Sequence, residues 1–246
     1  MQHQVLDIRA GAAGTTAKLY TYIRDESPEM EAHRRPAVVI CPGGGYGMTS
    51  DREAEPVALA YLAAGFQAFV LRYTIGGEYA FQAALEDVSG AVELVREHAA
   101  EWHLDPDKIA VCGFSAGGHL AAASGTLAAH KPNALILGYP CILESMSRIL
   151  AFPVPSLDQA VTPETPPAFL FHTRNDSSVP VENSLRFADA LDKAGVPFEL
   201  HIFAEGPHGL SLASSLTSSG REEMVCPDVS AWLPMSVGWL NRLFHL

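Results

Sequence analysis

The sequence predicts an α/β fold in which a mostly parallel sheet of about eight strands is flanked by helices on both faces. Two observations support this prediction: from Pro36 onward the chain contains short continuous apolar runs, and these runs alternate with segments whose apolar residues recur every three or four positions. Runs that are apolar on both faces are typical of parallel strands covered by helices on each side. Alternating strands and helices favour right-handed βαβ crossovers within one sheet.

The expected strands are an N-terminal pair and six buried runs. Val5–Ile8 and the alternating stretch Ala17–Ile23 predict an antiparallel hairpin at a sheet edge, joined across a Gly-rich turn. The six apolar runs follow in chain order: Ala37–Cys41, Gln67–Tyr73, Lys108–Gly113, Ala134–Tyr139, Ala168–His172 and Phe198–Phe203.

Helical spacing marks the segments between these runs. Apolar residues step by three and four from Phe81 to Ala99 and from Val181 to Leu191, and Gly195 supplies a stop after the second segment. We expect two more helices, over about Glu53–Ala64 and Pro234–Phe244, with Pro234 in a first turn.

One long stretch, 141–167, is rich in proline and has no periodicity. We expect residues 1–246 to form a single domain in which this stretch is a small lid or cap over the site, because long loops in compact domains are usually lids or binding loops. The alternative is a surface excursion without function.

Composition excludes several classes of function. The 246 residues are 48% hydrophobic, and 16 Lys+Arg against 28 Asp+Glu give a formal charge of −12 without a basic stripe, so we expect no nucleic-acid partner. No run approaches the ~18 apolar residues that span a bilayer, and the first residues show no signal-peptide pattern. Four cysteines without CxxC or metal-ligand spacing favour reduced thiols, a cytoplasmic location, and neither metal nor cofactor.

Residues Gly113–Gly117 match the pattern G-x-S-x-G and stand between an apolar run and a helical stretch that begins near Gly118. In this context a serine is held in a strained turn that exposes its Oγ, and the glycines let strand and helix pass closely. Ser115 is therefore the candidate nucleophile, and the N–H of Ala116 is a candidate oxyanion-hole donor. The alternative is a small-residue turn selected for packing.

Three consecutive glycines, Gly43 to Gly45, follow the run that ends at Cys41. Such a sequence predicts a tightly curled backbone, and the second donor of an oxyanion hole comes from a loop at this place. We assign that donor to Gly44 or Gly45. Pro42 stands where the common form of this loop has His, so no titratable side chain acts there. A flexible linker is the alternative.

Asp176 follows the run Ala168–His172, and His208 follows the run Phe198–Phe203. Both therefore lie at the carboxyl ends of strands, the edge where Ser115 is expected. The order Ser, Asp, His predicts that His208 is the base and that Asp176 orients it. The remaining candidates are weaker: packing or hydrogen-bonding imidazoles at His119, His172 and His201, surface residues His130 and His245, the rival acid Asp158, and a buried, inert thiol at Cys112.

These residues resemble the small acetyl esterases of the α/β-hydrolase fold, which are related to carbohydrate esterases that deacetylate xylan or xylo-oligosaccharides. The resemblance extends from Arg35 to the C-terminus and is carried by residues 42–46, 50–58, 113–118, 166–173, 176–185 and 206–210. It implies an esterase/lipase superfamily enzyme that hydrolyses acetyl esters on sugars by a metal-free Ser-His-Asp acyl-enzyme mechanism. The segment 141–167 is shorter than expected of this branch.

For the substrate pocket we expect walls from Tyr46, Tyr139 and Arg174, all at strand carboxyl ends. Tyr46 stacks on a sugar or packs within its loop, and Arg174 is a solvated residue or a partner of Glu53 if it does not contact substrate. The expected partner is a small-molecule ester, with no membrane partner and a homodimer left open. Alternative functions are a formamidase, a general short-chain carboxylesterase, a serine peptidase, and a catalytically inactive binding protein.

Overall fold

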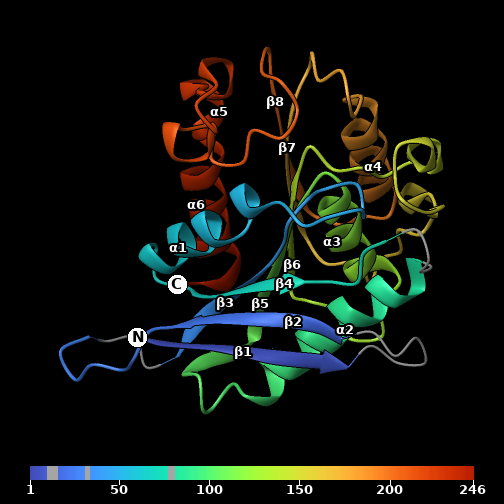
Figure 1. Ribbon diagram of the computed structural model, residues 1–246. Helices are drawn as coiled ribbons and strands as arrows, with labels where there is room; N and C mark the ends of the chain where they lie inside the picture. Colours follow the sequence, from blue (N-terminus) through green and yellow to red (C-terminus); the bar gives the residue numbers. More distant parts are fainter. Residues whose placement is uncertain (10–15, 31–33, 77–80) are drawn as a thin grey trace.

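The computed structural model describes residues 1–9, 16–30, 34–76 and 81–246, and these residues form an eight-stranded sheet (Figure 1). The strand order is β1-β2-β4-β3-β5-β6-β7-β8. Strands β3 to β8 are mutually parallel, which confirms the predicted fold class. The strands are β1 Gln2–Arg9, β2 Thr16–Ile23, β3 Arg35–Cys41, β4 Gln67–Arg72, β5 Leu104–Phe114, β6 Ala134–Gly138, β7 Ala168–Thr173 and β8 Phe198–Phe203.

The predicted N-terminal hairpin strands pair in an antiparallel register that sets Leu6 opposite Leu19. Strand β2 continues antiparallel against β4, so the pair extends the parallel sheet at one edge. The Gly-rich turn predicted between β1 and β2 falls on residues 10–15, which lie outside the described residues.

Helices cover both faces of the sheet because its central strands are apolar on both sides. On one face lie α2 Phe81–Glu97, α3 Ala116–Thr126 and α4 Glu182–Lys193; on the other lie α1 Glu55–Ala63, α5 Pro227–Ser230 and α6 Trp232–Phe244 (Figure 1). Alternate residues of one strand serve the two cores: Val39 joins the core under α2 and α3, and Val38 joins the core under α1 and α6. Among the described residues, no helix combines the length and apolar character needed to cross a membrane.

A second irregular segment, which no sequence pattern predicted, lies between β8 and α5. It contains two short 3-10 turns, Ser215–Thr217 and Glu222–Met224, and is fastened to the core by buried Leu210 and Met224. The predicted irregular stretch 141–167 contains 3-10 turns at Glu144–Arg148 and Leu157–Gln159. Both segments lie at the carboxyl ends of the parallel strands, and the candidate site is at that end of the sheet.

Candidate active site

Ser115 occupies the sharp turn between β5 and α3. Its backbone angles are φ 54° and ψ −118°, a conformation that is costly for a residue with a Cβ and that persists only when the surroundings impose it. Its N–H donates to the carbonyl of Gly138 at 3.0 Å, and its own carbonyl accepts from Cys141 N–H at 3.0 Å. A Cβ on Gly113 would lie 2.0 Å from the carbonyl oxygen of Gly117, so the motif glycine is required by the close passage of strand and helix.

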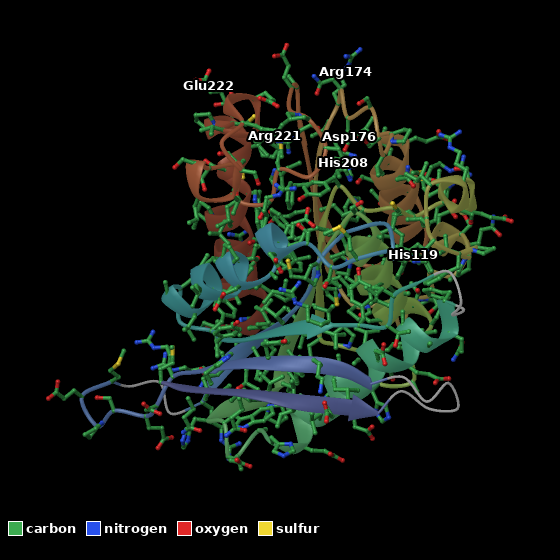
Figure 2. The ribbon with its side chains drawn as sticks, viewed as in Figure 1. His119, Arg174, Asp176, His208, Arg221 and Glu222 are labelled. Atoms are coloured by element: carbon green, nitrogen blue, oxygen red, sulfur yellow. The ribbon has the colours of Figure 1, made fainter. Side chains whose placement is uncertain are left out.

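The structure brings Ser115, His208 and Asp176 together in one hydrogen-bonded chain. His208 Nε2 lies 2.9 Å from Ser115 Oγ, and His208 Nδ1 lies 2.6 Å from Asp176 Oδ2. Ser115 directly follows β5, Asp176 lies in the loop after β7 and His208 in the loop after β8, and Figure 2 shows Asp176 and His208 next to each other. With Asp176 accepting Nδ1–H, Nε2 is left to accept the proton of the serine hydroxyl.

Asp176 is held as a carboxylate by the groups around it. Its Oδ1 accepts the N–H groups of Ser178 and Val179, each at 2.9 Å, and its Oδ2 also lies 3.5 Å from His172 Nε2. Burial by itself raises the pKa of Asp176, but the hydrogen bonds from His172 and His208 outweigh it and hold that pKa well below its usual range. An ionised Asp176 can therefore orient His208 and stabilise its imidazolium. The contact between His172 and Asp176 was not predicted from the sequence.

The glycine loop after β3 presents free N–H groups to the same place. Gly44 (φ 134°) and Gly45 (φ 66°) adopt angles that favour glycine, and neither N–H has an acceptor among the described residues. Ala116 begins α3, so its N–H has no partner within the helix. The Gly44 carbonyl accepts Gly47 N–H at 3.0 Å, which makes the loop an ordered turn rather than the flexible linker considered as the alternative.

Ser115 and His208 open into a cavity of about 390 Å³. Its apolar lining comes from Met48, Ile149 and Leu150, and its polar lining from Ser50, Arg52, Glu53 and Ser178, beside Gly44, Gly45 and Gly209. Ile149 and Leu150 belong to the predicted lid, so segment 141–167 forms one wall. That wall is joined to the glycine loop, because Ala151 N–H donates to the carbonyl of Gly45 at 2.8 Å.

Comparison with known proteins identifies the family. The BD-FAE family model matches residues 26–145, and the model of the prolyl oligopeptidase family matches residues 150–223. MGS-M1, an α/β-hydrolase enzyme from a Medee basin deep-sea metagenome library, has a crystal structure 41% identical in sequence, with a TM-score of 0.91 over 99% of both chains. The chain belongs to the α/β-hydrolase family.

Further relatives of this α/β-hydrolase are named as ester hydrolases. The acetyl ester-xyloside bifunctional hydrolase of Caldicellulosiruptor lactoaceticus is 37% identical, with a TM-score of 0.80 over 94% of this chain and 90% of that chain. The acetylxylan esterase of Xylanibacter ruminicola is 30% identical over 222 residues, 80% of this chain and 45% of that protein. The chain spans 36% and 45% of the length of two longer curated relatives that it matches.

Two tyrosines predicted as pocket walls of this α/β-hydrolase do not line the cavity. Tyr46 is fully buried and its hydroxyl donates to His119 Nδ1 at 3.0 Å, while its ring packs against Phe152 with centroids 4.6 Å apart. Tyr139 is 2% exposed, and its hydroxyl donates to Glu53 Oε1 at 2.6 Å. The prediction was wrong because both side chains turn under the loops at the strand ends instead of into the cleft.

Arg174 is exposed and also lies outside the cavity lining. Figure 2 shows its side chain pointing away from Asp176 and His208, toward solvent. Its predicted partner Glu53 is engaged elsewhere, by Gly43 N–H and by Tyr139. Arg174 is therefore the solvated loop residue considered as the alternative, and the guanidinium at the cavity belongs to Arg52.

The competing residues lie where they cannot replace the three site residues. His119 is fully buried and hydrogen-bonded, as predicted, and burial lowers its pKa to about 4. Asp158 lies 3.6 Å from Arg186 in segment 141–167. Cys112 is fully buried, and burial raises the pKa of its thiol well above the usual value, which leaves it unreactive.

Proposed function

We propose that this enzyme hydrolyses short-chain esters, acetyl esters above all, on the hydroxyl groups of sugars such as xylo-oligosaccharides, through an acyl-enzyme on Ser115. The single observation that carries the chemistry is the hydrogen-bonded chain Ser115–His208–Asp176, which opens into a cavity beside unpaired backbone N–H groups. The same arrangement is the minimum that acyl transfer by a serine requires.

In the acylation step, Ser115 Oγ attacks the carbonyl carbon of the ester while its proton passes to His208 Nε2. The carbonyl oxygen becomes an oxyanion, and we assign the N–H groups of Gly44 or Gly45, which line the cavity, and of Ala116, at the start of α3, as its hydrogen-bond donors. Each such donor is worth about 100- to 1,000-fold in kcat. As the tetrahedral intermediate collapses, the bond to the alcohol oxygen breaks, and the leaving alcohol takes the proton from His208.

Deacylation repeats the steps with water. His208 Nε2 takes a proton from the water as its oxygen attacks the acyl carbon, and the same N–H groups receive the new oxyanion. The bond to Ser115 Oγ then breaks, the serine recovers its proton from His208, and the carboxylic acid leaves. Asp176 stays ionised throughout, because its hydrogen bonds keep its pKa low.

The shape and lining of the cavity support a small acyl group and a polar alcohol. A volume of about 390 Å³ is near the lower end for ligand pockets and suits an acetylated sugar better than a long acyl chain. The hydroxyls of Ser50 and Ser178 and the guanidinium of Arg52 are groups that hydrogen-bond sugar hydroxyls. An acetylxylan esterase and an acetyl ester-xyloside hydrolase among the relatives support the same substrate class.

The rival activities share this chemistry and differ in the bond attacked. A general short-chain carboxylesterase would cleave activated acetyl and butyryl esters and leave the acetylated sugar intact, and a formamidase would cleave an N-formyl amide with little action on acetyl esters. The match of residues 150–223 to the prolyl oligopeptidase family makes a prolyl peptide a necessary member of any substrate panel.

Initial rates on such a panel test the proposal. It comprises p-nitrophenyl acetate, butyrate and octanoate, an acetylated xylo-oligosaccharide, N-formylkynurenine and a prolyl p-nitroanilide. Preference for acetate together with acetate release from the sugar, both lost in Ser115→Ala, is the expected result. Activity that survives in Ser115→Ala would overturn the mechanism, and rates that rise with acyl length would overturn the substrate class. Reaction of Ser115 with a fluorophosphonate separates an active enzyme from an inactive binding protein.

A further inference from the structure

Glu53 is a buried carboxylate at the active site that the proposed mechanism does not use. Glu53 is only 3% exposed, and it lines the edge of the cavity. Oε2 accepts Gly43 N–H at 2.8 Å, and Oε1 accepts the Tyr139 hydroxyl at 2.6 Å. Because a buried carboxylate is costly unless donors satisfy it, its position depends on these two hydrogen bonds.

The first hydrogen bond orients the glycine loop. Gly43 is fixed on both sides, since its N–H donates to Glu53 and its carbonyl accepts Ser50 N–H at 2.8 Å. A Cβ on Gly43 would lie 2.7 Å from Glu53 Oε2 and 3.1 Å from Ser115 Cβ, so this residue lies directly between the carboxylate and the serine. The peptide planes that follow carry the N–H groups of Gly44 and Gly45, whose directions are therefore set by the Glu53–Gly43 contact.

The second hydrogen bond reaches the loop of the base. Besides donating to Glu53, the Tyr139 hydroxyl accepts Ser211 N–H at 2.9 Å. The Tyr139 ring packs edge-on against His208, with ring centroids 5.1 Å apart. Tyr139 thus packs against one side of the His208 ring. It also links Ser211, three residues after His208, to Glu53, so it connects Glu53 to the loop that carries the base (the base loop).

The neighbouring residue, Arg52, strengthens the same connection. Its Nη1 donates to the carbonyl of Gly209 at 2.8 Å, and its own carbonyl accepts the hydroxyl of Ser211 at 2.5 Å. Two consecutive residues therefore fasten the base loop, and one of them also fastens the glycine loop. The two loops must be correctly placed relative to each other. In the proposed step Ser115 Oγ attacks the ester carbonyl, whose oxygen the glycine loop receives, while His208 in the other loop takes the serine proton.

We propose that Glu53 is a positioning residue of the esterase reaction, which acts through Gly43 N–H and the Tyr139 hydroxyl to keep the oxyanion donors aligned with His208. The inference rests on the proposed acyl-enzyme function. Its specific requirement is a group with two acceptor oxygens, because both partners donate. A glutamine retains the size of Glu53 but offers one acceptor oxygen, so it cannot accept from both Gly43 N–H and the Tyr139 hydroxyl.

The chain offers matched controls. Glu55 lies two residues away, and its Oε1 also accepts a tyrosine hydroxyl, that of Tyr22 at 3.2 Å, but neither residue lines the active-site cavity. Glu55→Gln and Tyr22→Phe therefore make the same chemical changes as Glu53→Gln and Tyr139→Phe outside the site.

The test compares these four variants with the wild type on p-nitrophenyl acetate and with 1,1,1-trifluoroacetone, which adds to a catalytic serine as a tetrahedral oxyanion. In Glu53→Gln we expect kcat to fall about 10- to 100-fold, KM to change less than about two-fold, and the inhibition constant of trifluoroacetone to rise in step with the loss in kcat/KM. Tyr139→Phe is expected to change in the same direction, and the double variant to lose little more than Glu53→Gln alone. The two control variants stay within about two-fold of the wild type.

A folded Glu53→Gln with wild-type kcat, a loss confined to KM, or unchanged affinity for trifluoroacetone would overturn the inference. If Glu53→Gln does not fold, Tyr139→Phe decides in the same way, because it removes the second contact and leaves the carboxylate on Gly43. Failure of the inference differs from failure of the proposed function: in the first case Ser115→Ala is inactive while Glu53→Gln is fully active, and in the second Ser115→Ala retains activity.

Discussion

His119 Nε2 lies 3.0 Å from the carbonyl oxygen of Pro155, which connects the helix behind Ser115 to the segment that walls the cavity. On its other side, His119 Nδ1 accepts the hydroxyl of Tyr46 at 3.0 Å. These partners require a neutral ring, with the proton on Nε2. Three parts of the site, namely helix α3, the glycine loop and segment 141–167, therefore meet at one buried imidazole.

This arrangement predicts a loss of stability in acid. Burial lowers the pKa of His119 from 6.5 to about 4, so between these values the unfolded chain binds a proton that the folded protein excludes. The free energy of unfolding therefore falls as pH drops from 6.5 to 4, by an amount on the order of 3 kcal/mol. His119→Gln retains a donor and an acceptor without titrating, and its urea-unfolding profile is expected to lack this component. His245→Gln, at an exposed histidine, is the control, and parallel profiles for wild type and His119→Gln would contradict the prediction.

At Asp87 we expect the opposite effect in nearly the same pH range: the free energy of unfolding falls as pH rises. This α2 residue is fully buried; its Oδ2 accepts Thr74 N–H at 2.6 Å, while its Oδ1 has no hydrogen-bond partner in the described part of the chain. Burial raises the pKa of Asp87 from 3.8 to about 6. The unfolded chain releases its proton near pH 4 and the folded protein only near pH 6, so stability falls on the order of 3 kcal/mol as pH rises through this interval.

Asp87→Asn isolates that contribution, because an amide imitates the protonated acid at every pH. Relative to this variant, the wild type is expected to lose stability between pH 4 and pH 6 and to show a constant difference above pH 7. Chemical denaturation at four or five pH values measures the difference directly. A wild-type-minus-variant difference that is the same at pH 4 and pH 7 would contradict the assigned pKa.

The close packing around Gly117 predicts that only glycine fits at this position after the sharp turn between β5 and α3. A Cβ at this position would lie 2.1 Å from the carbonyl oxygen of Cys41 and 2.4 Å from that of Pro42, and both are backbone atoms that cannot yield without moving the glycine loop. Gly117→Ala is therefore expected to lower kcat at least ~100-fold and to destabilise the fold by several kcal/mol. The control is Gly238→Ala on α6, where the nearest atom is Arg242 Nη1 at 3.6 Å and a helical alanine should stabilise by about 0.5–1 kcal/mol. Equal effects of the two substitutions would contradict the steric account.

The sequence predicts the sheet and the convergence of Ser115, Asp176 and His208, because each leaves a local signal. A strand such as β7 is apolar on both faces, and Ser115, Asp176 and His208 each follow a recognisable strand. The positions of Tyr46 and Tyr139 at strand ends were predicted equally well, but not the directions of their side chains. Those directions depend on the backbone angles of the two residues, φ 59° at Tyr46 and φ 36° at Tyr139, which cannot be predicted from the types of the neighbouring residues.

The contacts of Glu53 could not be predicted from the sequence for a different reason. Its contact with Tyr139 spans 86 positions in the chain and joins two loops whose relative placement only the folded sheet defines. Within its own segment, Glu53 looks like any acidic residue in the first turn of a helix. Sequence reasoning locates the candidate reacting groups, which are few and chemically distinctive, but not the ordinary side chains that contact the loops around them.

Asp176→Asn tests whether the orienting acid acts through the tautomer of His208. The oxygen facing Ser178 and Val179 accepts two backbone N–H groups, so the amide oxygen of an asparagine must take that position. Its NH₂ group then faces His208 Nδ1 and forces that nitrogen to accept. The ring proton moves to Nε2, which can no longer take the proton of Ser115, and kcat is expected to fall about 10⁴-fold.

The expected signature of this variant is a loss of kcat with little change in KM or in the unfolding temperature. Rates on p-nitrophenyl acetate and the speed of fluorophosphonate labelling should fall together, since both depend on deprotonation of Ser115. Asp158→Asn, which changes an acid that pairs with Arg186 instead, provides the control and should retain wild-type rates. If Asp176→Asn loses less than about tenfold in kcat while folded, the hydrogen bond of 2.6 Å to His208 does not govern the base, and a different acid must be sought.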